Sequence, residues 1–386
     1  MIPRAISRTV RELAKGYPAV AITGPRQSGK TTLARMLFPN KPYVSLEDPD
    51  IRGLAQEDPR AFLEKYDSGA ILDEVQRCPD ILSYLQVILD KRSRMGRFIL
   101  TGSQQFGLHS GITQSLAGRV AMVQLLPFTY DEVYKKPPSL DTMLYTGLYP
   151  PIYDRKLNPS TWQANYIQTY IERDVRQMIN VRDLSTFQRF LRLCAGRTGQ
   201  LLNLSRLASD VGITHNTAKS WISILEASYL VFLLRPHHRN FNKRIIKSPK
   251  LYFYDTGLAA WLLGIREAGQ LETHPLRGSL FECWVISELF KGQFNQGKPA
   301  DLFFWRDREG NEVDLLMERG NSLIPIEIKS GQTINRDFFR GLDYWRSYQE
   351  NDEIRSWLIY GGKEEHSRRN TTIISWTGLR KLMKEC

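Results

Sequence analysis

The chain has few cysteines, and their spacing excludes two classes of site. Cys78, Cys194, Cys283 and Cys386 are spread over 386 residues, and no C-x-x-C pair occurs. Neither a zinc knuckle nor a disulfide framework is therefore expected, and reduced thiols in a cytoplasm fit best. The N-terminal residues lack the apolar core of a signal peptide, and no apolar run reaches the roughly 18 residues of a membrane helix. We expect a cytoplasmic protein without a membrane segment.

Positive charge is in excess, and most of it lies in one segment. The net charge is +12, and residues 181–250 contain twelve Lys or Arg against three Asp or Glu, a net charge of +9. The length allows two or three domains of roughly 100–200 residues each. A local concentration of basic residues indicates a surface that binds a polyanion, so DNA is the expected partner. An ordinary solvated basic face is the alternative.

A strand–loop–helix pattern near the N-terminus predicts a nucleotide site. The apolar run 19–23 is followed by a G-x-x-x-x-G-K-T string and a helical pattern. In such a P-loop, backbone N–H groups surround the phosphates, the Lys reaches the β- and γ-phosphates, and the Thr hydroxyl holds Mg²⁺. ATP and Mg²⁺ are the predicted ligands. The predicted binding residues are Gly24, Pro25, Arg26, Gln27, Ser28, Gly29, Lys30, Thr31 and Thr32.

Polar residues that end later apolar runs are candidate catalytic groups. Asp73 and Glu74 follow the run 70–72. Asp73 is predicted to join the Mg²⁺ shell and Glu74 to orient or deprotonate the attacking water. Thr101, Ser103 and Gln104 follow the run 98–100. Ligands bind at the carboxyl ends of parallel strands, and Ser103 is preferred over Gln104 as the residue that contacts the γ-phosphate or the water.

An arginine could stabilise charge on the transferred phosphoryl group. Arg119, just before another apolar run, is the predicted residue, acting in its own or a neighbouring subunit. Arg92 and Arg94 compete for this role.

The basic segment contains a helix-turn-helix pattern followed by a wing. Ser205 is predicted to cap a short helix, Gly212 to make the turn and Thr214 to start a second helix. Ala218, Trp221, Ile222 and Leu225 would face inward. The predicted DNA contacts are His215, Asn216 and Lys219 on the second helix, and Arg239, Lys243, Arg244 and Lys247 on the wing. A winged helix used only for packing or subunit contacts is the alternative.

A polar face on a C-terminal hairpin predicts a metal site. Strict alternation would place Val313, Leu315 and Met317 on one face of the first strand and Asp314 on the other, with Glu327 and Lys329 beside it on the second strand. Glu282 lies on the apolar stripe of a predicted helix. The predicted Mg²⁺ site has Asp314 and Glu327 as ligands, Lys329 orienting water and Glu282 completing the shell. An ordinary half-exposed hairpin is the alternative.

The order of these motifs resembles a known family. The P-loop, the "LDE" at 72–74, "YIQTYIERDV" at 166–175 and the C-terminal "FECWVISEL", "EVDLLME" and "IPIEIKSG" carry the resemblance. They are similar to prokaryotic AAA+ ATPases with a C-terminal domain of unknown function (DUF4143-type) related to PD-(D/E)xK nucleases. The resemblance implies an ATPase that assembles as a ring.

The expected fold class is α/β in successive parts. We predict a P-loop AAA+ parallel-sheet domain at residues 1–135, a helical linker at 136–185, a winged helix-turn-helix at 186–265 and an α/β nuclease-like domain at 266–386. The predicted function is a homo-oligomeric, hexameric ATPase that hydrolyses ATP to bind and remodel DNA, with branched or structured DNA among the candidates. The alternatives are an ATP-gated, Mg²⁺-dependent nuclease in repair or defence and an ATP-dependent switch acting on a protein partner.

Overall fold

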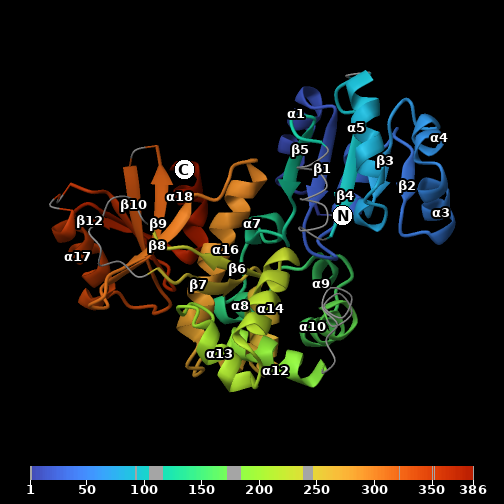
Figure 1. Cartoon of the computed structure of the whole chain (residues 1–386). Coiled ribbons are helices and arrows are strands. Elements are labelled where there is room, and N and C mark those ends of the chain that lie inside the picture. Colours follow the sequence, from blue (N-terminus) through green and yellow to red (C-terminus); the bar gives the residue numbers. More distant parts are fainter. Residues whose placement is uncertain are drawn as a thin grey trace.

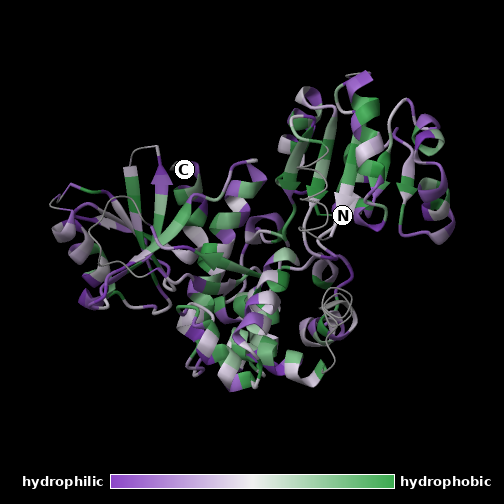
Figure 2. Cartoon of the chain, viewed as in Figure 1, coloured by the Kyte–Doolittle hydropathy of each residue, from purple (hydrophilic) through white to green (hydrophobic). Residues whose placement is uncertain are grey.

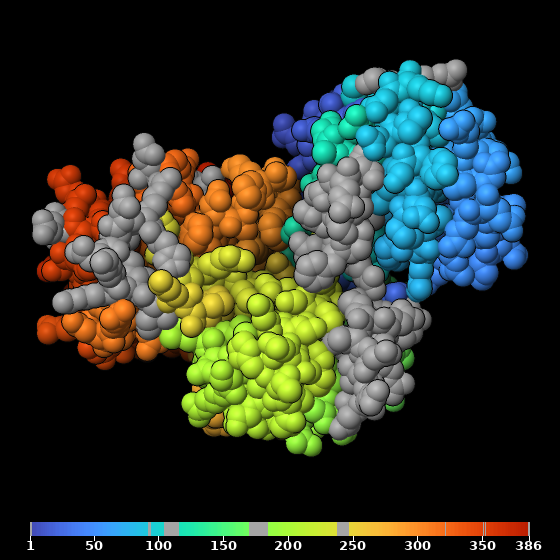
Figure 3. Space-filling model, viewed as in Figure 1, coloured from blue at the N-terminus to red at the C-terminus, as the bar shows by residue number. Residues whose placement is uncertain are grey.

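The computed structural model describes residues 2–91, 94–103, 116–171, 184–237, 247–320, 322–349, 351 and 353–385. The chain is an α/β protein with an N-terminal parallel sheet, a helical middle segment and a C-terminal mixed sheet (Figure 1), which confirms the predicted fold class. The N-terminal sheet and its helices form one lobe beside the rest of the chain (Figure 3). Among the described residues, no helix has the length and apolar character to cross a membrane.

The N-terminal sheet is buried on both faces. Its strands lie in the order β2-β3-β4-β1-β5, and every pair is parallel. All residues of β1 and β4 are buried, which is why these strands are continuous apolar runs. Parallel strands bring the ends of β1, β3 and β4 to one edge of the sheet. The bounds are β1 Ala19–Thr23, β2 Tyr43–Ser45, β3 Ile71–Asp73, β4 Phe98–Gly102 and β5 Val120–Gln124.

Helices cover both faces of this sheet. α1 and α2 pack on the side of Val20 and Ile22, and α3, α4 and α5 pack on the side of Ala19. Asp48 and Asp58 accept hydrogen bonds from backbone N–H groups at the starts of α3 and α4, and a proline follows each of them, which is a favoured helix start. The bounds are α1 Ser7–Gly16, α2 Lys30–Leu37, α3 Pro49–Glu57, α4 Pro59–Glu64 and α5 Ile81–Lys91.

The middle segment, which lies between β5 and α16, consists mainly of short helices. It includes the predicted helix-turn-helix, formed by α13 and α14. Gly212, with φ of 82°, ends α13, and Thr214 accepts a hydrogen bond from the Thr217 N–H at the start of α14. The prediction of Ser205 as the first cap is wrong, because Asn203 accepts the Arg206 N–H at 2.9 Å and the helix begins earlier. The bounds are α7 Tyr130–Val133, α8 Leu140–Thr146, α9 Pro150–Asp154, α10 Pro159–Tyr166, α12 Leu184–Ala195, α13 Leu204–Val211, α14 His215–Ala227 and α15 Thr256–Leu262, with single turns at Ile167–Ile171 and Ala268–Leu271.

A two-stranded ribbon follows the helix-turn-helix. β6 (Val231–Leu234) pairs antiparallel with β7 (Lys250–Phe253), as a wing requires. The inward side chains predicted for α14 are buried, namely Ala218, Trp221, Ile222 and Leu225. Three residues predicted on the wing, Arg239, Lys243 and Arg244, lie outside the described residues.

The C-terminal sheet is mixed, with strand order β12-β13-β11-β10-β9-β8. The β8-β9-β10 pairs are antiparallel, and β10-β11-β13 run parallel. α16 and α18 pack on one face and α17 on the other. The bounds are α16 Arg277–Asn295, β8 Leu302–Arg306, β9 Glu312–Arg319, β10 Ser322–Lys329, α17 Arg340–Tyr348, β11 Ser356–Tyr360, β12 His366–Arg368, β13 Thr371–Ser375 and α18 Leu379–Glu385, with single turns at Arg336–Phe339 and Trp376–Gly378.

A bulge in β9 changes which side chains share a face. The pairing with β8 skips one residue of β9 between Val313 and Leu316, so the alternation shifts there. Val313 and Leu316 pack on the α17 side, whereas Leu315 and Met317 join the core beside α16. The prediction that Val313, Leu315 and Met317 share one face is therefore wrong.

One hydrophobic core joins the middle and C-terminal segments. Buried residues from Leu126 to Leu382 form a continuous cluster that includes α14, β7, α16 and β10. Apolar residues concentrate in these inner elements and in the strands of the N-terminal sheet (Figure 2). The predicted boundary between residues 265 and 266 therefore crosses a shared core. α16 also reaches the exit of the N-terminal sheet, because Glu288 accepts the Tyr130 N–H at 2.9 Å and Lys291 donates to the Phe128 carbonyl at 3.0 Å.

Candidate functional site

The P-loop backbone depends on glycine where it leaves β1. Gly24 has φ of 149°, and a Cβ there would lie 2.1 Å from the Leu125 carbonyl oxygen. Gly29, with φ of 91°, precedes the first residue of α2. No other residue tolerates such a close approach, and L side chains rarely adopt these φ values. The loop therefore starts at the sheet edge and ends at a helix N-terminus, where a phosphate is favoured.

The Lys30 side chain is folded back on the loop. Its Nζ donates to the carbonyls of Gly24 at 3.1 Å and Pro25 at 2.8 Å, and the residue is buried. These carbonyls satisfy a buried ammonium group that would otherwise lose its water. A phosphate at the loop would offer Lys30 charged oxygens in place of neutral ones.

Hydroxyl groups surround the carboxylate of Asp73 at the end of β3. Thr31 Oγ1 donates to the two Asp73 oxygens at 2.9 and 3.1 Å, and Tyr43 OH donates to Oδ2 at 2.8 Å. Thr101 at the end of β4 also donates to Asp73. Burial, followed by the bond to Asp73, raises the pKa of Tyr43 to about 12. The Thr31 hydroxyl and the Asp73 carboxylate are adjacent hard oxygens, and this donor set fits Mg²⁺.

Glu74 has a strained backbone and two polar neighbours. Its φ of 56° lies in the left-handed region, which few non-glycine residues occupy. Ser103 Oγ donates to Glu74 Oε2 at 3.2 Å, and Gln76 Nε2 lies 3.1 Å from Ser103 Oγ and also donates to Glu74. The carboxylate is thus fixed beside the sheet edge where Lys30 and Asp73 lie.

Arg119, the predicted catalytic arginine, does not lie at this P-loop. Arg119 precedes β5, and its carbonyl accepts the N–H of Ala19, the first residue of β1. It therefore lies at the sheet edge opposite the P-loop, where its guanidinium pairs with Asp90, with Nη2 to Oδ2 at 3.0 Å. Arg94 is exposed, and Arg92 and Gln104 lie outside the described residues. Arg119 therefore cannot contact a phosphate at the P-loop of the same chain.

The middle segment holds the P-loop directly. Trp162 Nε1 on α10 donates to the Gln27 side chain at 3.1 Å, and Tyr166 OH donates to the Arg26 carbonyl at 3.3 Å. Tyr229, just before β6, shares a hydrogen bond of 2.8 Å with Thr23. The loop that would bind phosphate is thus bonded to the segment that contains the helix-turn-helix.

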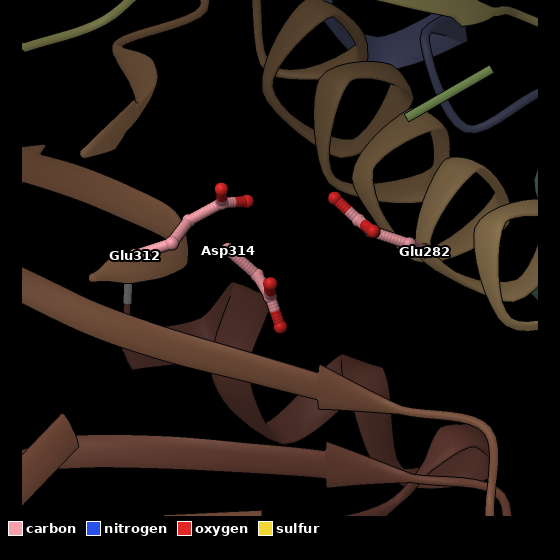
Figure 4. A group of neighbouring side chains, drawn as sticks. All are labelled: Glu282, Glu312 and Asp314. Atoms are coloured by element: carbon pink, nitrogen blue, oxygen red, sulfur yellow. The ribbon is translucent and has the colours of Figure 1, made fainter. Parts of the chain in front are cut away.

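A second group of acidic side chains lies between α16 and the C-terminal sheet. Oxygens of Glu282, Glu312 and Asp314 all lie within 4.8 Å of one another, and the three carboxylates point toward a common space (Figure 4). Asp314 also accepts the Ile328 N–H at 2.8 Å and the Lys329 ammonium at 2.9 Å. Lys329 in turn contacts Glu327 at 2.8 Å. The structure brings together the four predicted residues and adds Glu312.

The ammonium group of Lys250 already lies between two of these carboxylates. Its Nζ lies 3.1 Å from Glu282 Oε1 and also contacts Glu312, and only 2% of the residue is exposed. Burial alone would lower the pKa of Lys250, but the carboxylates of Glu282, Glu312 and Asp314 raise it above its ordinary value. A lysine that stays charged supplies the positive charge that these acids need.

The acid group does not fit a divalent ion while Lys250 is in place. Ion and ammonium would compete for the same oxygens of Glu282 and Glu312. Burial raises the pKa of Glu282 against the lowering effect of Lys250, and Asp314 adds to the rise. Burial and Asp314 also raise the pKa of Glu327 to about 8. Glu327 therefore keeps a proton below that pH, which disfavours its binding to a metal ion.

A groove runs along the second helix of the helix-turn-helix. Its volume is about 790 Å³, and His215, Lys219 and Lys247 line it. His215 and Lys219, together with Asn216, are exposed. Glu226 also lines the groove, and burial raises the pKa of its carboxyl. Three of the predicted nucleic-acid residues thus share one concave surface.

Three stretches of the sequence match known families. Residues 16–134 match an AAA domain, residues 137–269 a domain of unknown function (DUF8612) and residues 277–379 another (DUF4143). An uncharacterized protein of Mycobacterium tuberculosis and one of Mycobacterium bovis are each 33% identical over 334 residues, covering 85% of this chain and 74% of theirs. The chain belongs to the same family as these two mycobacterial proteins.

Two solved structures resemble this AAA-domain family member distantly. A Walker-type ATPase of Pyrococcus abyssi has a TM-score of 0.45 at 14% identity, covering 67% of this chain and 94% of that chain. AMPPCP-bound DnaA from Aquifex aeolicus has a TM-score of 0.30 at 14% identity, covering 57% and 85%. Neither likeness bears on the function of this chain.

Several residues that complete the sites of this AAA-domain protein are not among those predicted from its sequence. Gln76 lies two residues after Glu74, and Glu312 two residues before Asp314, so short-range spacing could have indicated both. Tyr43, Trp162 and Lys250 reach their partners from distant segments. No local pattern marks them.

Proposed function

We propose that the protein is an ATPase that binds ATP and Mg²⁺ at the P-loop and uses hydrolysis to bind and remodel DNA as a homo-oligomeric ring, with six subunits the expected number. The observation that carries the proposal is the bonding of the P-loop to the segment that contains the helix-turn-helix. The loop contacts Trp162 and Tyr166 on α10, and Thr23 at the end of β1 contacts Tyr229, two residues after α14. A change in the loop on nucleotide binding would reach both elements through these bonds. ATP turnover and the DNA-binding surface can therefore influence each other.

The nucleotide chemistry is assigned to side chains at one sheet edge. Lys30 exchanges its carbonyl partners for the β- and γ-phosphates. Thr31 and Asp73 would hold the Mg²⁺, which neutralises phosphate charge when bound. Glu74 orients the attacking water and accepts its proton, and Ser103, with its bond of 3.2 Å, keeps the Glu74 carboxylate in position.

DNA binding is assigned to the groove on α14 and to the wing. His215, Asn216 and Lys219 face outward on that helix, and Lys247 closes the groove from the other side. Arg239, Lys243 and Arg244, which follow β6 in the sequence and lie outside the described residues, are assigned to DNA binding from the sequence alone. Lysine and arginine side chains at such a surface contact phosphates.

Ring formation is supported by the position of Arg119. This arginine lies opposite the P-loop of its own sheet, so any contact with a γ-phosphate is made in a neighbouring subunit. A ring places such an edge against the next P-loop. Measurement of the solution mass with and without an ATP analogue tests assembly.

One assay tests the coupling proposal. ATP hydrolysis is measured with single-stranded, duplex and four-way-junction DNA, and nicking is followed in the same tubes. We expect at least one DNA form to raise the hydrolysis rate several-fold. A rate that no DNA form changes would reject the DNA proposal and favour the switch that acts on a protein partner.

A nuclease is the second candidate, and one observation favours it. Glu282, Glu312 and Asp314 converge as the ligands of a divalent ion would. The buried Lys250 opposes it, because it already neutralises two of these acids. We therefore expect no Mg²⁺-dependent nicking by the unaltered protein, and cleavage that Asp314→Ala removes would establish the nuclease instead.

A further inference from the structure

A pocket lined by arginines lies at the far end of the C-terminal sheet. It is formed by the turn Arg336–Phe339, by α17, and by the ends of β12 and β13, and its volume is about 290 Å³. The arginines are Arg336, Arg346, Arg368 and Arg369. Asp343 is the acidic residue of the lining. The pocket therefore has a clear excess of positive charge.

The floor of the pocket is a buried guanidinium that is held in place. Arg346 is 7% exposed, and its Nη2 donates to the hydroxyls of Thr371, at 2.6 Å, and Ser356. Its Nη1 donates to Asp343 at 3.0 Å, whose side chain is 60% exposed. Most of its partners are neutral, so its charge is balanced by one largely solvated carboxylate. A further anion at the floor would be favoured.

The rim arginines are exposed, and one of them is fixed by stacking. Arg368 lies over the Phe339 ring, with 5.1 Å from Cζ to the ring centroid, which limits its motion. Arg369 has φ of 51° in the turn between β12 and β13, a costly conformation for this residue. Within the described part of the chain, Arg336, Arg368 and Arg369 form no ion pair. Their donors are therefore available to a ligand.

We propose that this pocket binds a phosphate group. Arginine presents parallel N–H donors that match a phosphate, and several arginines around one cavity can bind it from different sides. The volume of the cavity is near the lower limit for pockets that bind small ligands, so it suits a ligand of about the size of one nucleotide. The phosphate can belong to a free small molecule or to a nucleic-acid strand. The inference does not rest on the proposed function, because α17 and β12 lie on the opposite side of the view from β1, after which the P-loop begins, with α14 between them (Figure 1).

The test compares the unaltered full-length protein with two variants, each of which has two arginines replaced. The pocket variant carries Arg368→Gln and Arg369→Asn, and asparagine tolerates the left-handed conformation. The control carries Arg308→Gln and Arg319→Gln, which removes two exposed charges from the β8–β9 side of the same domain. Inorganic phosphate is titrated calorimetrically in one arm. In the other, labelled single-stranded oligothymidine is titrated at several salt concentrations. The P-loop contribution is common to all three proteins and cancels in the comparison.

We expect the pocket variant to bind phosphate at least about 10-fold more weakly than the unaltered protein, since each charge-assisted hydrogen bond contributes about that factor. The control should bind like the unaltered protein. Arg336→Gln, on a different element, should reproduce the loss if the double variant folds poorly. Equal phosphate binding by all of these proteins would overturn the proposal.

The DNA arm distinguishes the two sources of phosphate. If the phosphate belongs to a strand, loss of two contacts lowers the log–log salt slope by about 1.4, at about 0.7 per single-strand contact. If only phosphate binding is lost and the slope is unchanged, the ligand is a free phosphate-bearing molecule. Failure of the proposed function would appear elsewhere, in an ATP hydrolysis rate that DNA does not change.

Discussion

The two acidic centres of this chain are neutralised in different ways. Asp73, at the edge of the N-terminal sheet, is surrounded by the hydroxyls of Thr31, Tyr43 and Thr101. The C-terminal acids instead surround ammonium groups, with Lys250 beside Glu282 and Lys329 beside Asp314 and Glu327. Hydroxyls hold a carboxylate without cancelling its charge, so a cation can still join it. Ammonium groups already supply that cation.

This difference shows that clustered carboxylates alone do not define a metal site. Buried negative charge must be compensated, and a protein can use a lysine or an ion for this purpose. Lys250 comes from β7, whereas its partners Glu282 and Glu312 come from α16 and β9. The ammonium therefore also connects the β6–β7 ribbon to the C-terminal sheet.

The largest effect is expected from Lys250→Met, which breaks the C-terminal centre. Removal of the ammonium leaves the partly buried Glu282 without its lysine partner and Glu312 with Arg306, and the free energy of unfolding should fall by about 3 to 5 kcal/mol. Mn²⁺ should then recover part of this loss, because an ion can occupy the vacated position. Urea unfolding with and without Mn²⁺ measures both changes. Lys363→Met, at an exposed position, is the matched control and should change little; a Lys250→Met protein as stable as the control would disprove the account of this centre.

Glu74→Gln should have the next largest effect, at the N-terminal centre. The amide cannot accept a proton from water, so the rate of ATP hydrolysis should fall at least about 10²-fold. ATP binding should remain, since Lys30 and Thr31 are unchanged, whereas Lys30→Ala should abolish it. Single-turnover hydrolysis and a nucleotide-binding titration separate the two steps. Hydrolysis by Glu74→Gln at a near-normal rate would remove this residue from the mechanism.

A smaller effect is expected at the groove on α14. Lys219→Ala together with Lys247→Ala should lower the log–log salt slope of duplex DNA binding by up to about 1.8, at about 0.9 per phosphate contact. Lys135→Ala with Lys136→Ala removes two exposed charges away from the groove and should leave the slope unchanged. An equal slope in both double variants would exclude the groove as the DNA surface.

The smallest effect tests the link between the P-loop and the middle segment. Trp162→Phe keeps an aromatic ring beside Tyr149 and Tyr166 but removes the donor to Gln27. Loss of one hydrogen bond corresponds to about 0.5 to 1.5 kcal/mol, and the stimulation of ATP hydrolysis by DNA should weaken about 2- to 10-fold. Basal hydrolysis should change less. Unchanged stimulation would show that this contact carries no coupling.

Local features of both centres could be predicted from the sequence. The P-loop string, the strand end at Asp73 and the start of α14 at Thr214 each depend on neighbours within a few residues. The first residue of α13 could not be predicted in the same way. Asn203 and Ser205 are both suitable cap residues, and packing decides between them. Asp314 and Glu327 were expected close together because hairpin pairing follows from alternation and the turn.

Other features depend on contacts between distant segments, which no local pattern specifies. The bulge in β9 reflects pairing with β8, and it shifts the alternation that the sequence implied. Lys250 looked like part of a basic wing, yet it is buried among acids because β7 packs beside α16. The shared core of the middle and C-terminal segments likewise follows from tertiary packing. Charge counted along the sequence did not reveal where each ammonium group would lie.

The number of divalent ions per chain tests the contrast between the two centres most directly. Mn²⁺ binding is measured by equilibrium dialysis in the presence of a non-hydrolysable ATP analogue, for the unaltered protein and for Lys250→Met. The account predicts one ion per chain for the unaltered protein, dependent on the nucleotide, and two for Lys250→Met. The account would be contradicted if the unaltered protein bound two ions. One of them would then stay bound without nucleotide and would be lost in Asp314→Ala.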